Sequence, residues 1–149
     1  MRSNSILPLL LAAIAGSLMP AQGAANSWLA RRSSLAMATF WVHTTAVLCI
    51  GLVLLFLPSS RSSLANLLHA PLPALLGGVM GVAITWLVAA AVTPLGMVAA
   101  TTGILVAQVA TAAVLDHFGL FGLHQSPFAW TKGLGAALLV LGAWLLLRK

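Results

Sequence analysis

Acidic residues are nearly absent from the chain, which contains one aspartate, Asp116, and no glutamate. Only 5% of its 149 residues are charged, whereas soluble domains carry about 25%. A water-soluble fold could not cover its surface with so few polar groups, so the solvent for most of this chain is lipid. Nucleic-acid binding, which needs a basic face in water, is excluded, because the cations stand at the ends of apolar runs.

Several kinds of reactive group are also missing. Cys49 is the single cysteine, so neither a disulfide nor a thiol metal site can form within one chain. There is no second acid and no Gly-rich phosphate loop, so we expect no enzyme activity, no cofactor and no metal. No carboxylate lies in the middle of an apolar run, and a cation exporter driven by a central carboxylate would therefore lack its key group. Neutral or weakly polar solutes are favoured.

Five apolar segments make up most of the chain, and the fourth runs for about 21 residues before it stops at Asp116. An apolar helix needs about 20 residues to cross a hydrocarbon core. The sequence predicts an all-α membrane protein with a single transmembrane domain over 1–149. An alternative for the first segment is a signal peptide, but its apolar stretch exceeds the usual core of about 7–15 residues. The expected spans are 6–25, 35–57, 73–92, 95–115 and 131–147, with links at 26–34, 58–72, 93–94 and 116–131.

The distribution of cations gives almost no preferred orientation. Five spans place the two termini on opposite sides, and cations in short loops normally mark the cytoplasmic side. Four cations on one side against three on the other leave a difference of one. Copies inserted both ways could pair about an axis in the membrane plane, which predicts an antiparallel dimer, either of identical chains or with a paralogue. The three are Arg2, Arg61 and Lys132, and the four are Arg31, Arg32, Arg148 and Lys149.

Four short motifs, in order along nearly the whole chain, resemble the YdcZ-type branch of the drug/metabolite transporter superfamily. They are Gln22 with Asn26, Gly77-Gly78 with Gly81, Gln108, and the block DHFGLFG at 116–122. The resemblance implies a small multi-pass protein of the bacterial inner membrane that works as an antiparallel homodimer or a paired heterodimer. One departure is His43, which follows Phe40-Trp41-Val42 where the family usually has glycine.

Strongly polar groups at membrane depth are costly and therefore mark candidate sites. Inversion of one copy brings Gln108 of the partner near the depth of Gln22 and His43, so we expect these residues and Asn26 to line one cavity. The same cavity could include Trp86 and Thr101. The alternatives are structural: glutamines that bond between helices, an Asn26 that caps a helix, a His43 bonded to a carbonyl at the interface, threonines bonded to their own helix, and a Trp86 that only packs. In its functional role His43 would be a proton-sensitive ligand.

Asp116 and His117 form a separate candidate, at the expected end of the fourth span. The helix macrodipole disfavours an anion at a C-terminus, so a nearby cation or imidazole should compensate Asp116. Three roles are open: a structural charge that pins the helix end and loop, a relay for protons or cations, and a metal site with His69 and His124, for which the spacing is not diagnostic.

The sequence thus predicts a small inner-membrane transporter subunit that moves a small polar or neutral solute by alternating access as an antiparallel dimer. A non-transporting scaffold or accessory subunit of a hetero-complex is the alternative. A half-transporter that works only with a paralogue is a related case. A passive channel is a further option, although no ring of like charges supports it.

Overall fold

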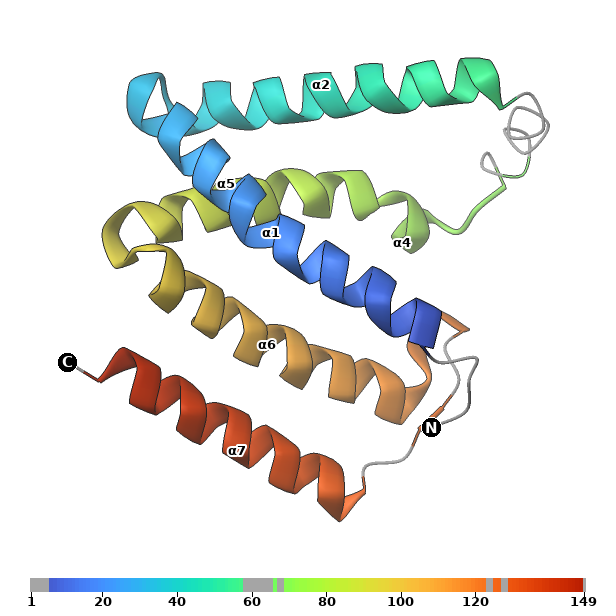
Figure 1. Ribbon diagram of the computed structural model, residues 1–149. Coiled ribbons are helices and arrows are strands. Elements are labelled where there is room, and N and C mark those ends of the chain that lie inside the picture. The colour runs from blue at the N-terminus through green and yellow to red at the C-terminus, as the bar shows by residue number, and fades with distance from the viewer. Residues whose placement is uncertain (1–5, 58–65, 67–68, 123–124, 127–128, 149) are drawn as a thin grey trace. The chain divides into compact units, whose positions relative to one another are not determined.

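The computed structural model describes residues 6–57, 66, 69–122, 125–126 and 129–148, and these residues contain helices and no strand. Five helical segments are long and apolar enough to span a membrane. The predicted all-helical fold with five spans is therefore confirmed, and the antiparallel dimer stays a prediction. In chain order the elements are α1 (Ile6–Arg32), α2 (Leu35–Phe56), α4 (Leu72–Leu75), α5 (Gly77–Leu95), α6 (Met97–Phe118), the 3-10 turn η3 (Leu120–Gly122) and α7 (Trp130–Leu147) (Figure 1).

The chain divides into two compact units, Met1–Pro94 and Leu95–Lys149, which are described separately. In the first unit α1 packs against α2. In the second unit α6 packs against α7. Both units bury small residues and turn most of their large apolar side chains outward, as expected where lipid replaces water and helices associate through close backbone approach. The buried residues are Gly23, Asn26, Ser27, Ala38, Thr39, Ala89, Val92, Ala100 and Ala143.

Helix α1 continues to Arg32, whereas the sequence led us to expect a link from Asn26 to Ser34. The polar residues after Ala25 remain helical because they bond along and between helices. Arg31 Nη1 donates to Ser27 Oγ one turn earlier, at 2.9 Å. The chain leaves the helix at Ser34, whose hydroxyl oxygen accepts from the Met37 amide at 3.1 Å and caps α2.

The third span is interrupted near its start and ends later than expected. Leu76, with φ −72° and ψ −5°, separates the single turn α4 from α5. Helix α5 includes Pro94 and ends at Leu95, although we expected a turn at Thr93-Pro94. The turn lies instead at Gly96, whose φ of +80° is a conformation that L side chains rarely adopt. Glycine therefore sets the boundary between the third and fourth spans.

The end of α6 explains the DHFGLFG block. Asp116 and His117 belong to the last turn of the helix rather than to the loop. Gly119 then takes a left-handed conformation with φ +61°, and its amide donates to the Leu115 carbonyl, which is a common way to end a helix. Phe121 is also left-handed, with φ +57°, which is rare for a bulky residue. The block thus encodes a sharp stop and a strained turn.

Candidate functional site

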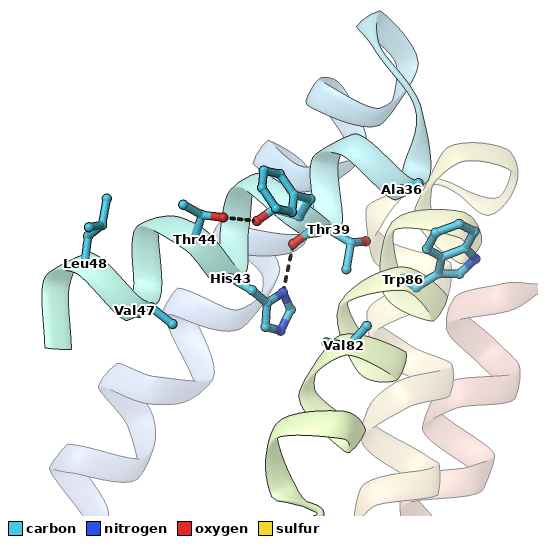
Figure 2. Close-up of a pocket in the computed structure, with 9 residues that line it drawn as sticks. Ala36, Thr39, His43, Thr44, Val47, Leu48, Val82 and Trp86 are labelled. Carbon is cyan, nitrogen blue, oxygen red and sulfur yellow. Dashed lines mark hydrogen bonds between the residues drawn. The ribbon is translucent and has the colours of Figure 1, made fainter. Parts of the chain in front are cut away.

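A cavity of about 580 Å³ lies between α2 and α5 in the first unit. This volume falls within the range of about 300–1,000 Å³ typical of small-molecule pockets. Figure 2 shows His43 of α2 pointing toward Val82 of α5, with Trp86 further along α5. No charged residue belongs to the lining, so the cavity offers no counter-charge to an ionic solute. The lining residues are Ala36, Thr39, Phe40, His43, Thr44, Val47, Leu48, Val82 and Trp86.

His43 supplies the most polar group of this cavity. Its Nδ1 lies 2.9 Å from the backbone carbonyl oxygen of Thr39, one turn earlier on α2 (Figure 2). Because a carbonyl oxygen only accepts, the proton of a neutral imidazole is on Nδ1 and Nε2 has a free lone pair. Nε2 faces α5, since a Cβ added to Gly81 would lie 3.6 Å from it. The structural alternative, a histidine bonded to a carbonyl, is therefore observed for one nitrogen, while the other is available as an acceptor.

Gly81 on α5 lies opposite His43 on α2. Gly77 and Gly81 both belong to the glycine motif of the third span. In the structure an added Cβ at Gly77 meets nothing within 4 Å, whereas Gly81 lies against the imidazole. The glycine on α5 thus leaves room for His43 on α2. It also keeps the approach to Nε2 open.

Thr39 is a pocket residue that the sequence did not single out. It is only 5% exposed, and its Oγ1 is buried without a hydrogen-bond partner in the described part of the chain. Thr44 and Thr45, by contrast, donate to the carbonyls of Phe40 and Trp41 one turn earlier. A buried hydroxyl left unpaired costs about 1–3 kcal/mol. No sequence signal separates Thr39 from the other threonines, because each has a helix carbonyl four residues back.

Two other predicted residues of the first unit do not line this cavity. Gln22 is exposed on α1, and Asn26 is buried at 7% exposure within the same helix. Helix α1 continues past Asn26 to Arg32, so Asn26 neither caps nor ends its helix. The first unit brings together His43 and Trp86 of the predicted set, and it adds Thr39.

A polar link between α1 and α5 was also not predicted. Ser27 is fully buried, and its Oγ lies 3.1 Å from Thr93 Oγ1. Thr93 Oγ1 donates to the Ala89 carbonyl at 3.0 Å, so Thr93 accepts from Ser27, which in turn accepts from Arg31. The donors thus run in one direction from the guanidinium to a helix carbonyl. The i,i+4 spacing of Ser27 and Arg31 is the sequence signal that could have indicated their bond.

In the second unit the predicted polar residues lie on α6. Gln108 is exposed near the middle of that helix. Thr101 Oγ1 lies 3.4 Å from Met97 Sδ, and Thr102 Oγ1 donates to the Val98 carbonyl at 2.7 Å. The structural alternative considered for the threonines, bonding to a carbonyl of their own helix, is therefore observed for Thr102, whereas Thr101 donates to a side-chain sulfur.

A second cavity, of about 730 Å³, lies between α6 and α7 and includes Asp116, His117 and Lys132 among its lining residues. Lys132 Nζ donates to Ser126 Oγ at 2.7 Å, and the Ser126 amide donates to the Asp116 carbonyl at 2.9 Å. Gln125 Nε2 donates to the His117 carbonyl at 3.1 Å. The loop is thus held to the end of α6 through backbone carbonyls, and these bonds do not involve the Asp116 carboxylate.

Metal-ligating side chains do not gather in groups of three or more among the described residues. The alternative metal site also required His124, which lies outside them, and His69, which belongs to the first unit. Among the residues that the structure describes, neither cavity gathers three metal-ligating side chains.

Comparison with family models gives a match over most of the chain. The family described as "Putative inner membrane exporter, YdcZ" matches residues 7–145. No match was found among curated proteins or among solved structures. The matched range contains α2, α4, α5 and α6 entirely and nearly all of α1 and α7.

Proposed function

Because this chain belongs to the YdcZ family of inner-membrane exporters, we propose that it is a transporter subunit that works by alternating access as an antiparallel dimer. The match over residues 7–145 is the observation that carries the proposal, and it supports a membrane transporter rather than an enzyme. The solute we propose is small and neutral or weakly polar. The dimer would rock one copy against its inverted partner around a shared polar cavity.

Exposed amides on two spanning helices support a partner subunit. Gln22 on α1 and Gln108 on α6 are both exposed in one chain. An amide in hydrocarbon without a hydrogen-bond partner is costly, so a second protein surface or a water-filled cavity must meet it. The near balance of cations, three against four, supports insertion in both orientations.

The proposed solute cavity combines residues from both copies. Gln22, Asn26 and His43 of one copy would face Gln108 and Thr101 of the partner, with Trp86 as an apolar wall. The α2–α5 cavity, which holds His43 and Trp86, supports this assignment from within one chain. The uncharged lining of that cavity supports a neutral solute.

Cysteine crosslinking tests the antiparallel arrangement. Cys49 is exposed and is first replaced by alanine, which leaves a cysteine-free chain. Gln22→Cys combined with Gln108→Cys should then give oxidised dimers in membranes. Leu11→Cys, on the same helix and also exposed, is the matched control, because its depth would meet Gln108 only in a same-facing pair. Dimers from Leu11 with Gln108 alone would contradict the antiparallel arrangement.

Flux into liposomes tests the transport activity. Radiolabelled nucleosides, sugars and amides serve as neutral solutes, and ethidium serves as an organic cation. Saturable exchange of a neutral solute is expected. Rapid unsaturable leakage would indicate a pore, and folded protein without flux would indicate an accessory subunit. Proton-driven export of ethidium would overturn the preference for neutral solutes.

Asp116 and His117 are proposed to hold the end of α6 while it moves. Asp116→Asn keeps the backbone carbonyl that accepts from Ser126. Solute exchange should therefore continue in this variant. Loss of proton dependence with exchange retained would indicate the relay instead.

A further inference from the structure

We propose that His43 Nε2 and the Thr39 hydroxyl form a hydrogen-bonding subsite for a neutral solute that donates an N–H or O–H from an apolar, ring-sized body. The inference rests on the proposed function, since it treats the α2–α5 cavity as a solute site. It adds a residue, Thr39, and a chemical class, a neutral hydrogen-bond donor.

The first observation is the direction of the His43 hydrogen bond. Nδ1 donates to the Thr39 carbonyl at 2.9 Å, so the neutral ring presents Nε2 as an acceptor. Among the described residues no donor bonds Nε2, and Gly81 opposite it carries no side chain. A solute that donates a hydrogen bond satisfies this nitrogen, whereas an acceptor-only solute does not.

The second observation is the unpaired hydroxyl of Thr39. It stands in the cavity wall one turn before His43, with its oxygen buried. Threonine in a helix populates two χ1 rotamers, and a rotation of about 120° between them would carry Oγ1 out of its buried position. In the proposed subsite the rotated hydroxyl bonds a polar group of the solute beside His43. Buried polar groups are nearly always paired, and this rotation would give the Thr39 hydroxyl the partner that it lacks here.

The third observation is the rest of the lining. Phe40, Val47, Leu48, Val82 and Trp86 are apolar or aromatic. Such walls suit a ring or a short aliphatic body, and Trp86 offers a surface for stacking. Because the walls carry no charge, the body they accept is neutral.

Phenol and its methyl ether, anisole, are a matched probe pair that differs in the O–H donor. Protein with ¹⁵N-labelled histidine is placed in bilayers and examined by magic-angle-spinning NMR, with the His43 signals identified by their loss in His43→Gln. Phenol should shift the Nε2 signal upfield and saturably, as an acceptor nitrogen does on bonding, and anisole should not. An equal shift with both, or no shift with phenol in folded protein, would overturn the proposal.

Thr39→Val and Thr45→Val are matched variants on the same helix. Thr45 does not line the cavity, and its hydroxyl already donates to the Trp41 carbonyl. Thr39→Val should weaken the phenol affinity read at Nε2 about three- to tenfold, the value of one hydrogen bond, while Thr45→Val leaves it unchanged. Without phenol, Thr39→Val should not lower the unfolding midpoint, since it removes an unpaired hydroxyl. Equal effects of the two variants on affinity would contradict the role of Thr39.

Gly81→Ala blocks the approach to Nε2 by a different route. The new methyl would sit in ordinary contact, 3.6 Å from Nε2, so the fold should be retained. Phenol should then no longer shift the Nε2 signal at concentrations that saturate the unaltered protein. Retention of the shift would overturn the proposed approach.

These measurements are independent of transport. Saturable solute flux with an unresponsive His43 would overturn this inference and leave the proposed function standing. A phenol-dependent shift of the His43 signal in a protein that gives no solute flux would overturn the proposed transport and leave the subsite standing.

Discussion

The two units of the chain place their polar groups differently. In Met1–Pro94 polar side chains join separate helices, through Ser27 and Thr93 between α1 and α5, and an imidazole on α2 faces Gly81 on α5. In Leu95–Lys149 the polar bonds that join separate elements gather at one end of α6, where Ser126 connects the loop to Asp116 and Lys132. Polar contacts in the first unit thus lie between helices, where the proposed solute site is. Those that join separate elements in the second unit lie at a helix end.

A contact between an arginine and a tryptophan occurs in both units. Arg32 lies 4.3 Å from the ring centre of Trp28 near the end of α1, and Arg148 lies 5.0 Å from that of Trp144 at the end of α7. Both pairs have i,i+4 spacing, and tryptophan and arginine are typical of membrane–water interfaces. Each unit thus has an arginine–tryptophan pair at a helix end, and the two units differ in their other polar contacts.

The largest expected difference concerns overpacking of the small buried residues. Ala89→Leu in the first unit replaces a side chain that is 1% exposed and should lower the free energy of unfolding by about 3 kcal/mol. Ala143→Leu in the second unit starts from 9% exposure and should cost about 1 kcal/mol. Unfolding by SDS in mixed micelles, followed by circular dichroism, measures both. Ala46→Leu on the outer face of α2 is the control, and equal losses in all three variants would contradict the packing described.

The link between α1 and α5 should have the next largest effect. Ser27→Ala removes the donor to Thr93 and the acceptor of Arg31, and it should destabilise the protein by about 1 kcal/mol. Ser17→Ala is matched, because the Ser17 hydroxyl is exposed and donates only to its own helix at Ala13. An unfolding midpoint that is the same for both variants would mean that the link contributes nothing to stability.

In the second unit the helix end can be tested in the same way. Gly119→Ala places a side chain at φ +61° and should cost about 1 kcal/mol. Gly103→Ala, in the interior of α6 with nothing within 4 Å of the added methyl, should be neutral or slightly stabilising. If Gly119→Ala were neutral as well, the left-handed stop would not be what ends α6.

The smallest expected effects compare two cation–hydroxyl bonds. Arg31→Met removes the bond to buried Ser27 and should cost about 0.5 kcal/mol, a value reduced because the guanidinium is exposed. Lys132→Met removes the bond to Ser126 in an exposed loop and should change stability by less than about 0.5 kcal/mol. A larger loss for Lys132→Met would reverse the contrast between the units.

The number of spans was predictable because apolar length alone decides it, but several boundaries were not. We expected polar residues such as Asn26 and Asp116 to lie in links, and both lie in helices. In lipid a helix can retain polar residues when other helices or loops supply partners, and a single sequence does not show those partners. The sequence places a turn at Thr93-Pro94 because proline usually ends or kinks a helix, whereas Pro94 lies inside α5 and the turn is at Gly96.

The candidate site was predictable in part. His43 and Trp86 could be chosen because such side chains are unusual at membrane depth, and one cavity contains both. Thr39 could not, because its distinction is a hydroxyl that packing leaves unpaired. The proposed meeting of Gln22 with Gln108 depends on a second chain, so it stays a prediction.

The unequal lengths of the first and last helices have a consequence for the choice of lipid. Helix α1 has 27 residues and is about 40 Å long, whereas α7 has 18 residues and is about 27 Å long. The apolar part of α1 before Asn26 has about the thickness of a hydrocarbon layer, so the last turns of α1, with Arg31 and Arg32, extend beyond it. Helix α7 falls slightly short of that thickness and is better matched by a thinner layer. Shorter acyl chains should therefore suit α7, while α1 tilts, kinks or thickens the bilayer around it.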